Sequence, residues 1–365
     1  KESDFYEFKG KGEFEIINGK HNFDFSIDSD NFFLLNKNFN DLKLVCKKED
    51  GKGNFKLNLN LDDKNSVSAK GEFILDEKKN LSLFADSLIF EMGKRRLYLT
   101  KKASLEIAED LFTIKNLQLD SGNSKFSFSG SFGLGKGERK IEGKLLMDNF
   151  SIILLPFLNI PNALSGRINA ELTIEGTLDN PNFFGELSLR NFAYELPESN
   201  LKLVGLLSCT FDKKKIDFKN AYLTTNEEGD LKLTGFIDFS QKAPFFDLKL
   251  FAEDFPVEYR NFFSGLTDID VSLRGSLDEP TIEGSVDILK GRIQLKETFV
   301  EELPVTVVFI GKTFPKQQNS FFKEIFSKLG GRVKVNAKRK LWILRKDLIA
   351  QLSGSVYINF TKDGV

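Results

Sequence analysis

Apolar and polar residues alternate along most of this chain, and no other feature of the sequence constrains the fold as strongly. From Ile168 to Ile174 every second residue is apolar and the residues between them are polar. The same alternation recurs in segments spread over the chain, at residues 55–61, 201–211, 231–239, 246–252 and 348–358. A period of two is typical of strands with one apolar and one polar face. The pattern therefore predicts an all-β fold built from two-faced strands.

An internal repeat organises these strands. Residues 165–185 align with residues 264–284 at an offset of 99, with seven identities in 21 positions, and upstream the offset becomes 105. The clearest repeat units span about residues 126–192 and 231–291. Because the alternation continues through their boundary, we predict one elongated repeat domain over residues 1–365. The chain starts at Lys1 in polar sequence and ends after a strand-like segment, so we expect a fragment of a longer chain.

The turns and glycines of the repeat predict its shape. The sequence Leu-Asp-x-Pro, at residues 178–181 and again at 277–280, is suited to end one strand of a hairpin and begin the next. A glycine inside a strand usually marks a bend, a bulge or a close approach. Bends at the middle of successive strands would crease the sheet, so we predict a continuous antiparallel sheet curled into a hydrophobic groove. The glycines in phase with the apolar face are Gly176, Gly185, Gly235, Gly275, Gly284 and Gly354.

The alternative arrangement is a stack of ordinary β-sandwiches whose apolar faces close against one another. Sandwich domains of about one hundred residues usually carry an aromatic anchor and are separated by linkers. No linker rich in Ser, Gly or Pro separates the repeats, and the strand pattern crosses the repeat boundary. These observations favour the continuous sheet.

Short helical inserts are predicted at three places. Apolar residues follow helical spacing in residues 151–164, 256–266 and 319–329, and Gly330 is suited to end the third helix. The first and third segments are strongly apolar, so we expect them to pack on the sheet or to plug the mouth of the groove. The alternative is transient occupation of the groove or contact with a membrane surface.

The composition excludes several classes of function. The 52 Lys and Arg residues nearly balance the 53 Asp and Glu residues, whereas nucleic-acid binders carry a clustered basic excess. Only His21, Cys46 and Cys209 are available for histidine or cysteine chemistry, which is too few for a zinc site or a catalytic triad. We therefore predict that the chain is not an enzyme, uses no cofactor or metal and binds no nucleic acid. No stretch approaches the roughly 18 apolar residues that cross a bilayer.

Three motif-like sequences do not fit the sites that they resemble. Gly-Lys-Thr at residues 311–313 follows a strand, but a phosphate-binding loop needs glycine where Thr306 stands, and Pro315 opposes the required helix. The glycines of residues 133–137 are expected to make a loose turn between two strands. Asp28, Asp30 and Asn31 resemble part of a calcium loop, but the glycine and the distant glutamate that such a loop needs are out of place.

The repeat motif resembles that of a known family. The string Gly-x-Ile-x-Ala-x-Leu-x-Ile-x-Gly-Thr-Leu-Asp-Asn-Pro-x-Phe-x-Gly-x-Leu-x-Leu, at residues 166–189, and its copy at 265–288 are similar to the repeated units of the TamB family in the AsmA-like superfamily. Residues 332–365, with Leu-Trp-Ile at 341–343, look like the start of the C-terminal region of that family. The first 125 residues carry only the strand pattern.

The resemblance implies both a fold and a role. Members are periplasmic proteins anchored in the inner membrane, and their strands form a long taco-shaped sheet with a hydrophobic groove. They are thought to act as bridges that carry phospholipid toward the outer membrane, and TamB proteins also work with an outer-membrane barrel of the TamA type in assembling outer-membrane proteins. By this resemblance, the inner-membrane anchor would lie outside the present chain.

A lipid conduit needs an unbroken apolar path, because each acyl CH2 exposed to water costs about 0.8 kcal/mol. An assembly chaperone that acts by β-augmentation without lipid transport, or a structural β-repeat protein, remains the alternative. The residues expected to line the groove and contact phospholipid are Ile168, Ala170, Leu172, Ile174, Gly176, Phe183, Gly185, Leu187, Leu189, Leu231, Leu233, Ile237, Phe246, Leu248, Leu250, Val271, Leu273, Gly275, Ile282, Gly284, Val286, Ile288, Leu352, Val356 and Ile358.

Overall fold

The computed structural model of the protein describes residues 9–17, 20–29, 32–34, 37–49, 52–62, 64–76, 78, 80–135, 137–154, 164–196, 199, 201–225, 229–259, 262–295 and 328–361. Nearly all of these residues lie in strands, so the all-β class predicted from the alternation is confirmed. The chain divides by its contacts into two units. Unit 1 comprises Lys1–Pro161, Ser165–Leu189 and Phe211–Lys213, and unit 2 comprises Asn162–Leu164, Arg190–Thr210 and Lys214–Val365.

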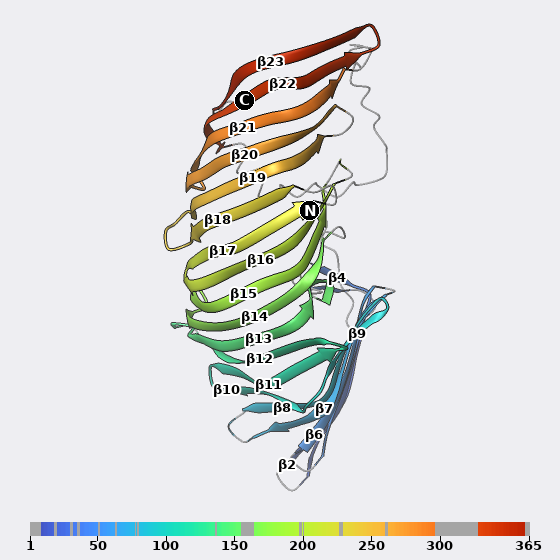
Figure 1. Cartoon of the computed structure of the whole chain (residues 1–365). Helices are drawn as coiled ribbons and strands as arrows, with labels where there is room; N and C mark the ends of the chain where they lie inside the picture. The colour runs from blue at the N-terminus through green and yellow to red at the C-terminus, as the bar shows by residue number, and fades with distance from the viewer. Residues whose placement is uncertain are drawn as a thin grey trace, which may run out of the picture. The chain divides into compact units, whose positions relative to one another are not determined.

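The strands of unit 1 pair with one another in antiparallel order (Figure 1). Between β8 and β11 the ladder position is shared by two short strands, because β9 pairs with one half of β8 and β10 with the other half. The strands β3 and β4 form a separate two-stranded sheet. The bounds are β1 (Lys9–Ile17), β2 (Lys20–Ser29), β3 (Phe32–Leu34), β4 (Lys37–Phe39), β5 (Asp41–Glu49), β6 (Lys52–Asp62), β7 (Asn65–Leu75), β8 (Leu81–Met92), β9 (Arg95–Leu99), β10 (Ala103–Ala108), β11 (Leu111–Ser121), β12 (Ser124–Gly133), β13 (Ile141–Ser151), β14 (Leu164–Thr177) and β15 (Asn180–Glu195).

Unit 2 contains a second ladder, in which β17 to β23 pair in chain order (Figure 1). All of these pairs are antiparallel except β21 with β22, which is parallel. A parallel pair needs a long connection that returns the chain to the same end of the sheet, and 35 residues separate β21 from β22. The prediction of an entirely antiparallel sheet is therefore wrong at this step. The bounds are β16 (Lys202–Lys213), β17 (Lys215–Thr225), β18 (Asp230–Asp238), β19 (Phe245–Tyr259), β20 (Phe263–Ser276), β21 (Glu279–Gln294), β22 (Gly330–Arg345) and β23 (Leu348–Phe360).

The internal repeat is visible as a shared bulge. In β13 the pairing register shifts at Asn149, which has a φ of 47°, and its N–H donates to Oδ1 of Asn169 at 2.9 Å. In β19 the register shifts at Asp254, which has a φ of 46°, and its N–H donates to Oδ1 of Asp268 at 3.0 Å. Asn and Asp tolerate positive φ better than other residues with side chains. The two copies therefore share one bulge, held by the same side-chain contact.

The predicted hairpins are also present in both copies. The strand β14 ends at Thr177 and β15 begins at Asn180, while β20 ends at Ser276 and β21 begins at Glu279. The two residues between each pair of strands form the turn. Leucine opens each turn, and its N–H donates to a carbonyl oxygen at 2.8 Å in both copies.

The predicted helical inserts are only partly described. The described residues of the segment 256–266 form no helix, since β19 runs on to Tyr259 and Pro256 pairs with Leu266 of β20. That prediction is wrong because long-range pairing overrides the helical spacing of a short segment. In residues 151–164 the structure describes a 3-10 turn over Ile152–Leu154, and residues 155–163 lie outside the described part. Of residues 319–329 it describes only two, Lys328, which is helical, and Leu329, which is not, and β22 starts at Gly330, where the sequence predicts the helix to end.

The six in-phase glycines all have positive φ, between 102° and 149°. At Gly235 a Cβ atom would lie 2.0 Å from the carbonyl oxygen of Asp247, and at Gly284 it would lie 2.1 Å from that of Asp270. Side chains other than hydrogen therefore do not fit at these two positions. The close approach predicted for glycines inside the strands is confirmed there.

Candidate functional site

Three rows of directly paired residues cross β17 to β23 of unit 2 without a polar side chain. Directly paired residues of a sheet point to the same face, so the rows form one surface, which we call the apolar face. The rows are Leu223, Leu231, Ala252, Ile269, Val286, Val335, Val356; Ala221, Leu233, Leu250, Val271, Gly284, Val333, Ile358; and Phe218, Gly235, Leu248, Leu273, Ile282, Gly331, Phe360.

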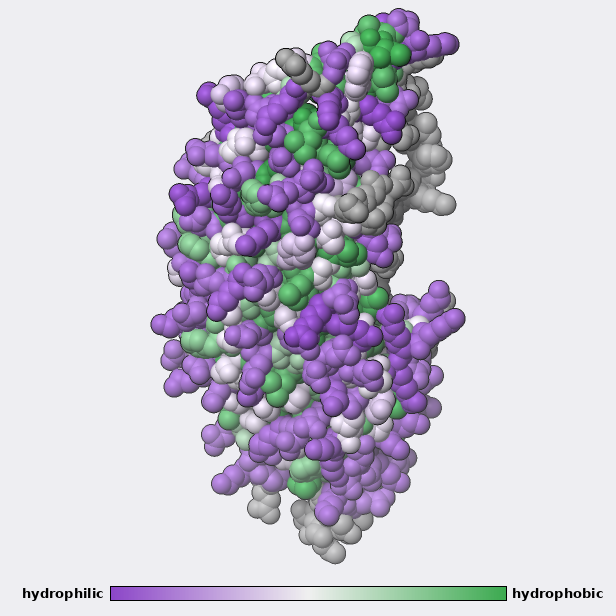
Figure 2. Space-filling model, viewed as in Figure 1, coloured by the Kyte–Doolittle hydropathy of each residue, from purple (hydrophilic) through white to green (hydrophobic). Residues whose placement is uncertain are grey.

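The opposite face of the same strands is charged. Lys249 of β19 forms an ion pair of 3.1 Å with Asp270 of β20, and Arg274 of β20 contacts Asp247 of β19 at 3.0 Å. Charged and polar residues cover most of the surface visible in Figure 2, with small apolar groups between them. Exposed pairs of this kind stabilise by at most about 1 kcal/mol each. The ion pairs therefore contribute little to stability, and the difference between the two faces of the sheet is that one is apolar and the other is charged.

The apolar face is only partly shielded from solvent. Ala221, Ala252 and Val333 are buried, whereas Leu248, Leu273 and most other residues of the rows are half-buried. At the last described strand, the exposed fraction of Val356 reaches 60%. A closed core would bury such residues fully. The strands of the second repeat and the strands after it also belong to one ladder, which agrees with a continuous sheet within this unit rather than with separate sandwiches.

Unit 1 carries the same kind of surface. Three rows cross β11 to β14 without a polar side chain, namely Ile114, Gly130, Gly143, Ile174; Leu117, Phe128, Leu145, Leu172; and Leu119, Phe126, Met147, Ala170. Toward β2 the first row contains one charged residue, Lys48, which pairs with Phe23 and Gly53. The rings of Phe23 and Phe73, from the same row, meet at 5.8 Å. In unit 1 the first of the apolar rows is therefore interrupted by a charged side chain at Lys48.

Every residue predicted to line the groove lies in a strand. Five are in β14, four in β15, three in β18, three in β19, three in β20, four in β21 and three in β23. Most of the predicted residues of unit 2 meet on the apolar face through the rows given above, and Ile237, Phe246 and Gly275 meet in a further row of directly paired residues. The other two pair with apolar residues as well, Ile288 with Ala337 and Leu352 with Leu341. Those of β14 and β15 meet in unit 1, where a Cβ on Gly185 would lie 3.2 Å from the Cα of Leu172.

The sequence prediction omitted residues that share these rows. Val333 and Val335 of β22 alternate like the predicted residues, and so do Phe126 and Phe128 of β12. Alternation alone could have found them. By contrast, nothing local in the sequence shows that β22 lies beside β21, because 35 residues separate the two strands.

The residues weighed for other chemistry are not gathered into a metal site in the described part of the chain. No group of three His, Cys, Asp or Glu residues is placed to hold a metal ion there. Gly133 ends β12, and Gly135 and Gly137 lie in its connection to β13, as expected for a turn. His21 lies in β2 and pairs with Ile16, while residues 30, 31 and 311–313 lie outside the described part. Within the described ranges, no helix combines the length and apolarity needed to cross a membrane.

The two thiols differ in their environment. Both are free; Cys209 is buried and Cys46 is half-buried. Burial raises the pKa of Cys209 to about 11 and raises the pKa of Cys46 as well. Since only the thiolate is alkylated, and about one in a thousand thiols of pKa 11 is ionised at pH 8, iodoacetamide should modify Cys46 first. Peptide mass spectrometry of the folded protein should show this order, and denaturation in urea should abolish it.

Comparison with known proteins agrees with the C-terminal part of this architecture. Residues 218–365 match the family model described as TamB C-terminal domain. The match includes segment 332–365 and extends upstream to Phe218, the first residue of the third apolar row. No curated protein and no solved structure matches the chain. Residues 218–365 of this chain therefore belong to the TamB C-terminal domain family.

Proposed function

We propose that this chain is part of a TamB-like protein of the cell envelope that carries phospholipid between the inner and outer membranes, with the acyl chains lying along the apolar face. Family membership implies a location in the envelope. In this proposal the protein acts in the periplasm, is anchored in the inner membrane by another part of the full-length chain, and performs no catalysis.

The observation that carries the proposal is the set of unbroken rows across β17 to β23. Neighbouring strands are about 4.8 Å apart, so seven strands provide an apolar path roughly 29 Å long. This length is about the thickness of the hydrocarbon core of a bilayer, roughly 30 Å. A whole acyl chain can therefore remain in apolar contact while it moves across the strands.

Curvature of the sheet would deepen the apolar face into a groove. The positive-φ glycines Gly235, Gly275 and Gly284 occur in three strands of unit 2, where they allow close approach of neighbouring backbones. The residues predicted from the sequence would line this groove, and the headgroups would stay in water along its rim. Leu248 and Leu273 are only half-buried, as expected for an apolar surface that binds an apolar ligand.

A role in assembling outer-membrane β-proteins is the second candidate. Among the described strands, β23 pairs with β22 alone. A sheet edge of this kind can accept a strand from a client or from a TamA-like barrel partner by β-augmentation. This role is compatible with lipid transport but does not need the apolar rows.

Native mass spectrometry of the purified protein tests the lipid proposal. We expect phospholipid to stay bound to the folded chain when the aqueous buffer is exchanged. Detergent should extract the lipid, because the contact between lipid and protein is apolar. A folded protein that remains free of lipid after incubation with phospholipid vesicles would contradict lipid transport. If the same protein then captured an unfolded outer-membrane β-protein, the assembly role would be favoured.

A further inference from the structure

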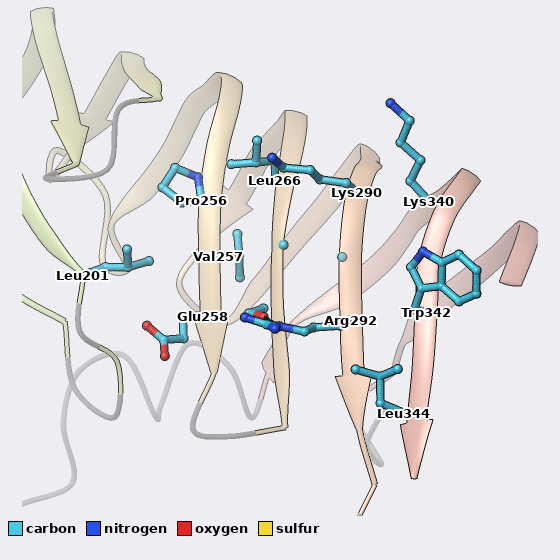
Figure 3. A pocket seen from close by; sticks show the side chains of 13 residues that line it. Leu201, Pro256, Val257, Glu258, Leu266, Lys290, Arg292, Lys340, Trp342 and Leu344 are labelled. Carbon is cyan, nitrogen blue, oxygen red and sulfur yellow. Dashed lines mark hydrogen bonds between the residues drawn. The ribbon is translucent and has the colours of Figure 1, made fainter. Parts of the chain in front are cut away.

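A cavity of about 990 Å³ lies in unit 2 at one end of β19 to β22 (Figure 3). Its lining includes Lys290 and Arg292 of β21, Lys340 and Trp342 of β22, and Leu266 of β20. We propose that this cavity binds an alkyl phosphate, with the phosphate held by Lys290 and Arg292, Lys340 adding to the positive charge of the lining, and the alkyl chain lying on the apolar lining. The site goes beyond the lipid path proposed above, because it lies on the other face of the sheet.

Strand pairing places Lys290, Arg292 and Trp342 of the lining on the charged face, whereas Val257, which also lines the cavity, pairs with Gly265 on the other side. Ile269 and Val271 of β20 belong to the apolar face, and they occupy odd positions of the strand. Ser264 and Leu266 occupy even positions, so their side chains point to the opposite face. Two paired rows that begin in β19 make up much of the cavity lining. They are Pro256, Leu266, Lys290 and Glu258, Ser264, Arg292, Trp342.

Bulges in the neighbouring strands β21 and β22 place Lys290 and Lys340 in the cavity lining. The register of β21 with β22 shifts between Ile288 and Gly291, and the facing shift in β22 lies between Ala337 and Leu341. Lys290 and Lys340 are residues of these two shifted stretches. Bulges re-aim side chains that a regular ladder would direct elsewhere. The basic lining is therefore a product of how the two strands meet.

Among the described residues, several cations elsewhere on the charged face are neutralised by a carboxylate, unlike the two lysines of the cavity. Lys249, Arg274 and Lys338 each form an ion pair with an aspartate. Within the described part of the chain, no ion pair is formed by Lys290 or by Lys340. The Nε of Arg292 donates to the hydroxyl of Ser264 at 3.0 Å. Glu258 is the one carboxylate in the lining, so the cavity carries an excess of positive charge.

The shape of these groups favours a phosphate ester over other anions. The guanidinium of Arg292 offers a planar fork that suits two phosphate oxygens, and the ammonium group of Lys290 can approach a remaining oxygen as a point charge. Trp342, with an exposed fraction of 42%, and Leu344 and Leu266 supply apolar surface beside the cations. Figure 3 shows Lys290 and Arg292 extending across the sheet toward β20, with Trp342 on the adjacent strand β22. An alkyl chain attached to the phosphate would lie on this surface.

Trp342 makes the site directly observable, because it is the one tryptophan of the chain. We expect dihexyl phosphate to shift the emission of Trp342 to shorter wavelength in a saturable titration, as the indole loses contact with water. Inorganic phosphate should compete only weakly. The double variant Lys290→Gln, Lys340→Gln should weaken binding of dihexyl phosphate about tenfold, whereas Lys232→Gln, a charge on the same face outside the cavity, should leave it unchanged.

Two further arms decide the ligand and its source. Hexanoate at the same concentration should shift the emission less than dihexyl phosphate; an equal shift would overturn the choice of phosphate. A shift of the Trp342 emission with vesicles that contain an anionic phosphate lipid, but not with zwitterionic vesicles, would identify a membrane as the source of the ligand. A shift with monomeric dihexyl phosphate alone would identify a free phosphate ester. Unchanged binding by the double variant would overturn the site itself, and circular dichroism of that variant checks that it is folded.

Discussion

Leu273→Asp is expected to leave the sheet folded while abolishing the binding of phospholipid. Leu273 lies in the middle of the third apolar row, between Leu248 of β19 and Ile282 of β21, and is half-buried. In a closed core a new carboxylate would cost several kcal/mol and unfold the repeat. On an open face it can reach water, so we expect a loss of about 1 to 2 kcal/mol in the free energy of unfolding. Native mass spectrometry should detect little or no bound phospholipid.

The neighbouring variant Arg274→Asp is the matched control. Arg274 lies one position further along β20 and points to the opposite face, where it contacts Asp247. Losing this exposed ion pair costs about 1 kcal/mol or less, and bound lipid should remain. Global unfolding of Leu273→Asp in circular dichroism would indicate a closed core. A folded Leu273→Asp protein that still bound lipid at the wild-type level would remove the apolar face from the mechanism.

Gly235→Ala is expected to be among the most damaging small substitutions in unit 2. Gly235 has a φ of 112°, and a Cβ there would lie 2.0 Å from the carbonyl oxygen of Asp247 in the neighbouring strand. Neither the backbone strain nor the collision can be relieved without separating β18 from β19. We therefore expect a loss of about 3 kcal/mol or more in the free energy of unfolding, measured by urea denaturation.

Gly354→Ala separates the two causes. Gly354 of β23 has a φ of 144°, but a Cβ there would meet no atom within 4 Å. The substitution therefore adds strain without collision, and we expect a loss of about 1 to 2 kcal/mol. Equal losses for the two variants would show that close approach of β18 and β19 contributes nothing to the requirement for glycine.

Much of the strand structure could be predicted because its causes are local. The alternation from Ile168 to Ile174 defines a two-faced strand wherever its partner lies, and Leu-Asp-x-Pro at residues 277–280 favours a turn by its own dihedral preferences. The in-phase glycines could be interpreted in the same way. The candidate surface followed from these patterns, because residues on one face of a strand stay together under any pairing that keeps the register.

The sequence by itself determined the strands, their faces, the turns and the internal repeat, since each depends on residues close together in the chain. Only the tertiary structure decided that residues 256–259 continue β19, that β22 runs parallel to β21, and that bulges gather Lys290 and Lys340 beside Trp342. These features depend on hydrogen bonds and contacts between segments that are distant in the chain. The free energy of such pairing exceeds the weak preferences of a short segment, and no local pattern encodes it.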